Sequence, residues 1–390
     1  MIVRPPREDD DEQIYEVGRL AFGGPRDPEP AYLWSGQKGW HGLVAELDGR
    51  LAGTLKARDY RQFFGGAAVR MAGIANVAVA PAARGHGVAN ALLDAILPEL
   101  RDRGQVISAL YPSVPPLYRG RGWEQTGNYE RVTLRPEHFA TLPRPARRLV
   151  MRRVTEADLP ALQDCYLRFA STVDGMLDRA TAAFRIEKLL DLDLVEVAPG
   201  PDGTILGYLT GERPDGDKLV IHDLVADDRD TTLGLFANLA RWSGIITDIS
   251  LRIDDPAWWQ LLVPLPVLHD VRNHPWMLRV VDLPAAVAAR GWPIAAHLAD
   301  TSVDIDVTDE HAPWQSGRHR LVVEGGKVVC DPGGEGTVRL RARALGPWFA
   351  GSADTAMLRR GGLLDGDANA ARVLDLLTGA PRLPRMADSF

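Results

Sequence analysis

The fold is decided by the stretch Asn76-Val77-Ala78-Val79-Ala80-Pro81-Ala82-Ala83-Arg84-Gly85-His86-Gly87-Val88-Ala89-Asn90-Ala91-Leu92-Leu93, which predicts a strand, a tight loop and a helix. Pro81 ends the strand because proline cannot donate a ladder hydrogen bond. Gly85 and Gly87 let the backbone curl, so that several N–H groups can face one point. The helix starts directly afterwards, and a helix N-terminus carries unpaired N–H donors. The stretch therefore predicts a site for an anionic phosphate.

Other interpretations of this loop are open from its spacing alone. A strand-to-helix turn with glycines also occurs in α/β proteins that bind no ligand there. Rossmann and P-loop sites are disfavoured because Gly-x-Gly-x-x-Gly is absent and no Lys-Ser/Thr pair follows. The pattern Arg84-x-x-Gly87-x-Ala89 closely resembles the pyrophosphate-binding motif of the GNAT acetyltransferases, Gln/Arg-x-x-Gly-x-Gly/Ala. The resemblance implies that this loop holds the pyrophosphate of acetyl-coenzyme A.

Composition restricts the class of protein. The chain has 390 residues, which suggests two or three domains, and its 45% hydrophobic and 25% charged content is typical of soluble globular proteins. No apolar run reaches the roughly 18 residues of a membrane span, and the first residues lack the apolar core of a signal peptide. Two cysteines, Cys165 and Cys330, make neither a disulfide framework nor a metal site, so we expect a cytoplasmic protein without a metal. The net charge of −7 disfavours nucleic acid and suits a cationic substrate.

The elements around the opening stretch follow the order of a GNAT fold. A strand at 1–3 and a helix from residue 8 precede a hairpin, 42–47 and 51–56, whose turn contains Asp48-Gly49. A strand at 69–79 leads into the loop and its helix, after which we expect a strand at 106–110, a short helix and a strand at 129–134. A linker rich in proline, 136–145, follows.

The linker is followed by a repeat of the same plan. Ile2-Val3-Arg4 recurs as Val150-Met151-Arg152, with acidic residues at the same spacing behind each. The segment 226–233 takes the place of the phosphate loop, but it has no paired glycine, and its three aspartates would repel a pyrophosphate. We therefore expect a second, degenerate GNAT unit that has lost coenzyme binding.

The last part of the sequence changes pattern again. A helix at 283–290 precedes strands at 302–307, 318–323, 327–330 and 336–341, and helices follow at 344–350, 354–360 and 367–377. This α+β layer resembles the sterol carrier protein type 2 fold. That fold holds a lipid, so a lipid- or ligand-binding carrier is an alternative function.

The whole chain is therefore expected to be a mixed α/β (α+β) protein of three domains. These are a catalytic GNAT domain (1–140), a degenerate GNAT domain (147–282) and a sterol-carrier-like domain (283–390). This order resembles the Eis (enhanced intracellular survival) family of bacterial aminoglycoside acetyltransferases over essentially the whole chain. Its marks are the 84–89 motif, the segment Leu117-Tyr118-Arg119-Gly120-Arg121-Gly122-Trp123 and the terminal Phe390.

The resemblance implies a function and an assembly. The chain would transfer an acetyl group from acetyl-CoA to amines of aminoglycoside antibiotics or related polyamines, and it would form a homo-hexamer. Acetylation of a protein lysine or of a metabolite amine is the alternative within the same chemistry.

Acetyl transfer needs an acid, a base and a polarised carbonyl. Tyr118 is the candidate acid, because a phenol with a pKa near ~10 stays protonated at neutral pH. The resemblance implies that the base is the α-carboxylate of Phe390, an ordinarily weak base with a pKa near ~3.5 that would take a proton from an ammonium bound in an enclosed site. A packing tyrosine and a disordered C-terminus are the ordinary alternatives.

The remaining site residues fall into two sets. The coenzyme is expected to contact Val77, Ala78, Val79, Arg84, Gly85, His86, Gly87, Val88, Ala89, Asn90, Ser113 and Val114. Carboxylates and aromatic faces that could hold a cationic acceptor are Asp27, Trp34 and Asp388, with Glu29 and Trp40 nearby.

Overall fold

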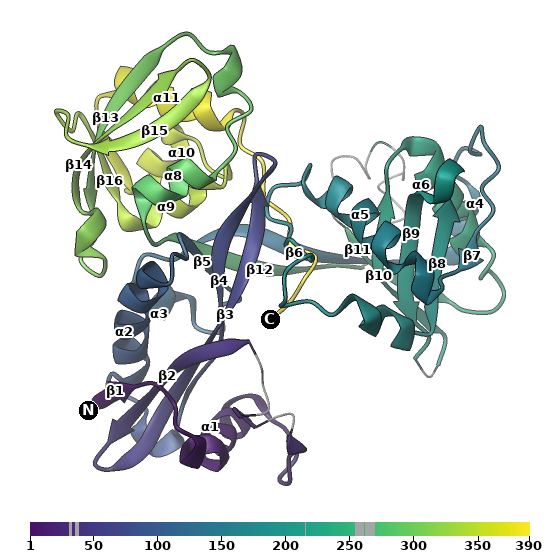
Figure 1. Ribbon diagram of the computed structural model, residues 1–390, viewed down its shortest axis with the longest axis horizontal. Helices are drawn as coiled ribbons and strands as arrows, with labels where there is room; N and C mark the ends of the chain where they lie inside the picture. The colour runs from purple at the N-terminus through teal and green to yellow at the C-terminus, as the bar shows by residue number, and fades with distance from the viewer. Residues whose placement is uncertain (31–32, 36–38, 215, 254–260, 262–269) are drawn as a thin grey trace.

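The computed structural model describes residues 1–30, 33–35, 39–214, 216–253, 261 and 270–390. Figure 1 shows three bodies around a central stretch of β-sheet: the first unit, the second unit, and the C-terminal domain. The fold class expected from the sequence is confirmed. Within the described residues, no helix is long and apolar enough to cross a membrane.

The first unit follows the expected order of elements. α1 and α2 lie on opposite faces of its sheet: Leu43 and Ala45 pack on the side of α2, whereas Val44 packs with Ile14 of α1, because successive strand residues point to opposite faces. Its elements are β1 (Ile2–Arg4), α1 (Asp11–Phe22), β2 (Trp40–Leu47), β3 (Arg50–Phe64), β4 (Ala67–Val79), α2 (Val88–Asp102), β5 (Ile107–Leu110), α3 (Pro115–Arg119) and β6 (Glu124–Leu134).

The second unit repeats this plan, as the sequence predicts. A connection that contains α4 (Pro136–Ala140) leads into it. Its elements are β7 (Arg152–Arg153), α5 (Leu159–Ala170), β8 (Leu194–Pro199), β9 (Ile205–Glu212), β10 (Lys218–Ala226), α6 (Arg229–Ala240), β11 (Asp248–Ile253) and β12 (Asp270–Val280).

The two units share one twelve-stranded sheet. Its strand order is β1-β2-β3-β4-β5-β12-β6-β11-β10-β9-β8-β7. β12, which comes last in the second unit, pairs with β5 and β6 of the first unit, and β6 in turn pairs with β11. Each unit is thus completed by a strand from the other. The segment between residues 140 and 147 connects the two units along the chain, but the sheet itself continues from one unit into the other.

The C-terminal domain has the strands and helices that its pattern predicts, each within a few residues of the expected bounds, together with the short additional strand β17. Its five-stranded sheet has the order β15-β14-β13-β16-β17. Trp348 and Phe349 of α9 are buried in a core that continues into Tyr60 and Phe64 of β3. Its elements are α8 (Leu283–Ala289), β13 (Thr301–Thr308), β14 (Gly317–Glu324), β15 (Lys327–Pro332), β16 (Val338–Arg341), α9 (Ala342–Phe349), α10 (Thr355–Arg360), β17 (Leu364–Gly366) and α11 (Ala368–Thr378).

The C-terminal tail, residues 379–390, returns from this domain to the centre of the molecule, where the label C stands in Figure 1. The backbone N–H of Arg385 donates to the carbonyl oxygen of Asp174 at 2.8 Å, and its guanidinium pairs with Glu130 at 2.8 Å. Met386 is buried, and Arg252 donates to the carbonyl oxygen of Ala387. The start of the tail stays bonded to its own domain, where the backbone N–H of Arg382 donates to the carbonyl oxygen of Gly351 at 2.9 Å, and its later residues are held by both units.

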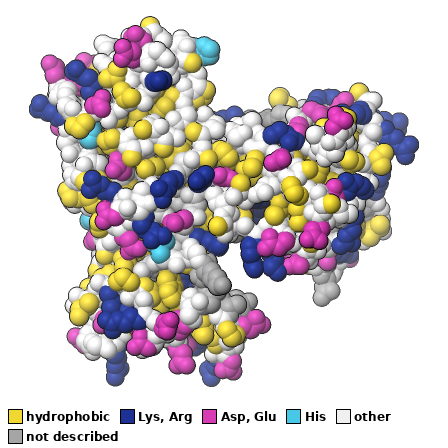
Figure 2. Space-filling model, in the orientation of Figure 1, with side chains coloured by type: hydrophobic (Ala, Val, Ile, Leu, Met, Phe, Trp, Pro, Cys, Tyr) yellow, Lys and Arg dark blue, Asp and Glu magenta, His cyan; other side chains and the backbone are white. Residues whose placement is uncertain are grey.

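The surface shown in Figure 2 carries a mixture of charges. On this face Lys and Arg side chains alternate with Asp and Glu side chains instead of forming one continuous basic region. Nucleic-acid binding is favoured by a continuous basic patch.

Candidate functional site

A wedge-shaped opening forms where β4 and β5 separate. Their parallel pairing runs from Met71 opposite Ile107 to Ile74 opposite Leu110 and stops there, because β5 ends while β4 continues to Val79. Beyond that point, β4 has no strand partner on its β5 side within the described residues.

A bulge in β4 lies at the same place. The pairing of β3 with β4 shifts between Thr54 and Lys56, and Asn76 has a positive φ of 50°. An asparagine adopts this left-handed conformation more easily than most residues. The bulge and the separation together expose backbone groups of Val77 and Val79, whereas the side chain of Ala78 is buried.

The loop between β4 and α2 presents free backbone N–H groups. Gly85 and Gly87 have φ angles of 83° and 76°, and no atom lies within 4 Å of the Cβ position at either glycine. The N-terminus of α2 has no side-chain cap. The N–H groups of Val88, Ala89 and Asn90 therefore find no acceptor in the described chain, and they are available to an anionic ligand.

The side chains of this loop differ in exposure. Arg84 is exposed and makes no ion pair with the described residues, so its guanidinium is free to meet a phosphate. The ring of His86 turns back onto the loop, with Nδ1 at 3.1 Å from the carbonyl oxygen of Arg84. Val88 is 2% exposed and packs against Gly53, where a methyl group would lie 2.5 Å from its Cγ1.

The second unit lacks such a loop, as its aspartates predict. At the N-terminus of α6 the carboxylate of Asp228 accepts hydrogen bonds from the backbone N–H of Thr231 at 2.8 Å and from its hydroxyl at 2.9 Å. The guanidinium of Arg147 binds the same carboxylate at 3.3 Å. A phosphate at this position would meet a carboxylate that already caps the helix.

Tyr118 faces the opening from α3. It is 4% exposed, and burial raises the pKa of its phenol above the ordinary value, an effect that a hydrogen bond with the Ser113 side chain partly offsets. Its carbonyl oxygen accepts from the backbone N–H groups of Arg121 at 2.9 Å and Trp123 at 3.2 Å. The short helix thus fixes the phenol beside the end of β5, with its proton retained.

Phe390 lies at the same opening although it comes from the far end of the chain. Its ring centroid is 5.1 Å from that of Tyr60 and 5.8 Å from that of Tyr111. The hydroxyl of Tyr111 donates to the carbonyl oxygen of Asp388 at 2.7 Å. These contacts place the C-terminal residue, which would ordinarily be disordered, in a defined position.

Tyr118 and Phe390 line one cavity of about 360 Å³. Ser113 also lines it, whereas Val114 is 53% exposed outside it. The cavity is lined by Phe22, Ile74, Ala75, Asn76, Val77, Leu110, Tyr111, Ser113, Tyr118 and Phe390. A phenol that can donate a proton and the residue that bears the C-terminal carboxylate therefore meet at the point where the strand backbone is free.

The residues expected to hold a cationic acceptor do not meet in this cavity. Asp27 and Glu29 are exposed on the loop after α1. Trp34 is half-buried beneath the ammonium of Lys56, 5.8 Å from its ring centroid, and Trp40 lies beneath Arg58.

Asp388 has a different environment from the one that acceptor binding requires. Its carboxylate pairs with the guanidinium of Arg179 at 3.0 Å and faces a separate cavity of the second unit. A carboxylate already neutralised by an arginine is a poor site for an ammonium group.

The sequence does not predict two tyrosines that hold Phe390: Tyr111, which lines the cavity, and Tyr60, which packs on the Phe390 ring. Tyr111 follows β5 directly, and Tyr60 lies within β3 on a face that packs against the tail. The position of Tyr111 just before Pro112 at the end of a buried strand is a signal that could have identified it. Tyr60 has no such signal, because its partner Phe390 is distant in sequence.

Within the described residues, no group of three or more His, Cys, Asp or Glu side chains is arranged to hold a metal ion. Both cysteines are buried, and burial raises the pKa of each thiol to about 12, so neither is a nucleophile at neutral pH.

Comparison with known proteins agrees with this geometry. Residues 2–126 match the family described as an acetyltransferase (GNAT) domain, and residues 283–387 match a sterol carrier protein domain. The chain is 28% identical to the N-acetyltransferase Eis of Mycobacterium tuberculosis over 84% of this chain and 83% of that protein. It is 27% identical to an uncharacterized N-acetyltransferase of Streptomyces avermitilis, over 84% of each chain.

Solved structures show the same arrangement over the full length. A GCN5-related N-acetyltransferase from Kribbella flavida has a TM-score of 0.82 and 29% identity, and the match covers 100% of both chains. Eis1 from Mycobacterium abscessus has a TM-score of 0.76 at 23% identity with the same coverage, which supports the fold. Acetyl-CoA is the acetyl donor of GNAT proteins. The chain is thus a GNAT-type N-acetyltransferase, homologous to the Eis proteins and ending in a sterol carrier protein domain.

Proposed function

We propose that this enzyme transfers the acetyl group of acetyl-CoA to an amine of an aminoglycoside or a related polyamine, with Tyr118 as general acid and the Phe390 carboxylate as general base. The observation that carries this proposal is the cavity at the end of β5, which Tyr118 and Phe390 line together. Tyr118 lies in the first third of the sequence and Phe390 at its far end, and their meeting requires the tail to return across both units.

The coenzyme fits the groups that the first unit leaves free. The pyrophosphate would lie on the N–H groups at the start of α2, with the Arg84 guanidinium beside it, because this helix end has no cap of its own. The pantetheine would run along Val77 and Val79 of β4, whose backbone groups face the opening. This path places the thioester near Ser113 and Tyr118.

The two proton transfers of the reaction are assigned to Phe390 and Tyr118. The amine nitrogen forms a bond to the acetyl carbon as the carbon–sulfur bond breaks, and the nitrogen loses a proton while the sulfur gains one. The C-terminal carboxylate of Phe390 would accept the proton from nitrogen, and the phenol of Tyr118 would donate to sulfur. Burial keeps Tyr118 protonated, which its donor role requires.

Two observations support a cationic acceptor. The net charge of the chain is −7, and the cavity contains the residue that carries a terminal carboxylate. Acetylation of a protein lysine or a metabolite amine uses the same residues. From the resemblance to Eis proteins we also propose a cytoplasmic homo-hexamer.

The test measures release of the coenzyme thiol with acetyl-CoA and a panel of amines: kanamycin, spermidine, a lysine-containing peptide and phenethylamine. We expect the fastest release with kanamycin or spermidine, and a large loss of that release in Tyr118→Phe. Faster release with the peptide or phenethylamine would contradict the proposed acceptor class. Tight binding of a fatty acid without thiol release from any amine would favour a carrier function instead.

A further inference from the structure

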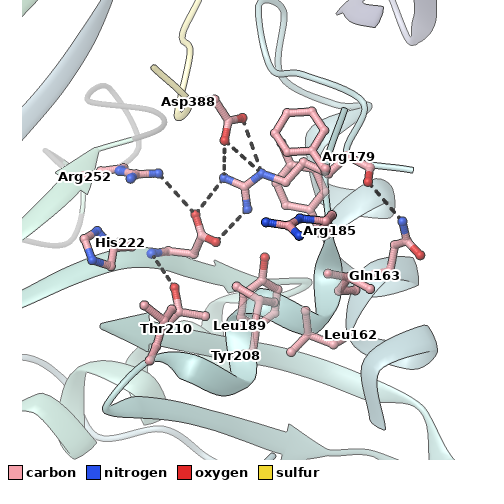
Figure 3. A pocket seen from close by; sticks show the side chains of 15 residues that line it. Leu162, Gln163, Arg179, Arg185, Leu189, Tyr208, Thr210, His222, Arg252 and Asp388 are labelled. Atoms are coloured by element: carbon pink, nitrogen blue, oxygen red, sulfur yellow. Dashed lines mark hydrogen bonds and ion pairs between the residues drawn. The ribbon is translucent and has the colours of Figure 1, made fainter. Parts of the chain in front are cut away.

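A second cavity, of about 230 Å³, lies in the second unit (Figure 3). It shares no lining residue with the cavity of Tyr118 and Phe390, called the active cavity below. It lies between α5, β9, β10 and the segment 184–192. Asp388 of the tail lines it, two residues before Phe390. The acetyl transfer proposed above does not use this cavity.

One wall of this cavity is apolar. It consists of aliphatic and aromatic side chains from α5 and from the segment that follows α5. These side chains are Leu162, Tyr166, Phe184, Ile186, Leu189 and Leu192. Such a wall suits the hydrocarbon part of a ligand and is too extensive for a site that binds only an inorganic ion.

The opposite wall is ionic, and most of its charges are already paired. The guanidinium of Arg179 binds Asp223 at 2.6 Å and Asp388 at 3.0 Å, and Arg252 lies 3.7 Å from Asp223. Arg185 also lines the cavity, and in the described part of the chain no carboxylate pairs with it. Three arginines against two aspartates leave the cavity with an excess of positive charge.

Tyr208 adds a hydroxyl donor that faces the cavity. The residue is 1% exposed, and Figure 3 shows its hydroxyl turned toward Arg179 and Arg185. It makes no hydrogen bond with any residue that the structure describes. Burial raises the pKa of this phenol well above its ordinary value, so the group remains a donor. The hydroxyl is therefore available to an acceptor group on a ligand in the cavity.

We propose that this cavity binds a small amphipathic carboxylate, whose carboxyl group accepts from the Arg185 guanidinium and the Tyr208 hydroxyl while its apolar body lies against Leu162 and Leu189. Arginine is suited to this role because its planar fork matches a carboxylate in two parallel hydrogen bonds. An amine would meet excess positive charge instead. No acetyl transfer occurs at this site, because Asp228 occupies the helix end where a coenzyme phosphate would lie.

The test is calorimetric titration of the full chain, without acetyl-CoA, with phenylacetate and indole-3-acetate, and with the matched amines phenethylamine and tryptamine. We expect the carboxylates to bind in preference to the amines. Arg185→Gln and Tyr208→Phe should each weaken binding about tenfold or more, since each removes a charge-assisted hydrogen bond. Arg241→Gln, which removes an exposed arginine outside the cavity, should leave the affinity unchanged.

Three results would overturn this inference: equal or tighter binding of the amines, unchanged carboxylate affinity in Arg185→Gln, or no carboxylate binding at millimolar concentration. Arg185 is exposed, so its replacement keeps the fold and remains informative if Tyr208→Phe is unstable. The effects of Arg185→Gln and Tyr208→Phe are independent of whether the first unit binds amines or transfers acetyl groups, because neither residue lines the cavity of Tyr118 and Phe390.

Discussion

Replacing Gly73 by alanine should displace the C-terminal residue from the active cavity. A methyl group at Gly73 would lie 2.7 Å from a ring carbon of Tyr60 and 2.9 Å from Cδ2 of Phe390. Carbon atoms pack at about 3.5–4.0 Å, so each ring must move by about 0.6 Å or more. Tyr111 also packs on the Phe390 ring, with 5.8 Å between the ring centroids, so the ring cannot simply rotate away. Displacement of Phe390 therefore also moves its terminal carboxylate.

The expected effect is on turnover and not on coenzyme binding. A misplacement of about 1 Å costs about 100-fold in rate, so a shift of this size should lower kcat by about 10- to 100-fold. The assay is thiol release for kcat and KM of the amine, with calorimetry for the coenzyme Kd. Gly361→Ala is the matched control, because its methyl group would meet no atom closer than 3.5 Å. A Gly73→Ala enzyme that is folded and retains kcat within about twofold would refute the reasoning.

Three further predictions test other parts of the site and fold. The pH profile of kcat should show no falling limb below about pH 10, because burial raises the pKa of Tyr118 above its ordinary value and the acid is lost only when pH exceeds it; a falling limb near pH 8 would exclude Tyr118 as the donor. Gly87→Val should weaken coenzyme binding at least about tenfold by calorimetry, whereas Gly203→Val, at the same φ of 76° and equally open, should not; equal effects would contradict phosphate binding at the loop. Asp309→Ala leaves the buried Arg279 without its carboxylate, 2.8 Å away, and should cost about 3–5 kcal/mol in urea unfolding, whereas Asp365→Ala, which breaks an exposed pair, should leave the midpoint nearly unchanged; a small effect of Asp309→Ala would mean that Arg279 finds another partner.

The sequence predicts those features that depend on neighbouring residues. The positive φ angles at Gly85 and Gly87 are predictable because glycine adopts them without steric cost. The helix that follows starts without a distant partner. Asp228 likewise caps its own helix, which explains why the degenerate loop was recognisable. The order of strands and helices in all three parts follows from the same local patterns.

Contacts between residues that are distant in the sequence could not be predicted from such local patterns. β12 pairs with β5 although about 160 residues separate the two strands in the sequence, and no local pattern specifies which strand lies beside β5. The sequence favours Asp388 as an acceptor-binding carboxylate, whereas the structure pairs it with Arg179, which is far away in sequence. Tyr60 contacts Phe390 only because the tail returns to it.

The central claim is that the C-terminal carboxylate completes the catalytic cavity. Its most direct test is a semisynthetic chain in which the α-carboxylate of Phe390 is a primary amide, since this removes the base while the ring keeps its contacts with Tyr60 and Tyr111. We predict that kcat falls about 100-fold or more, the usual contribution of a general base, while the coenzyme Kd stays unchanged. Turnover of the amide within about twofold of the native chain would contradict the claim.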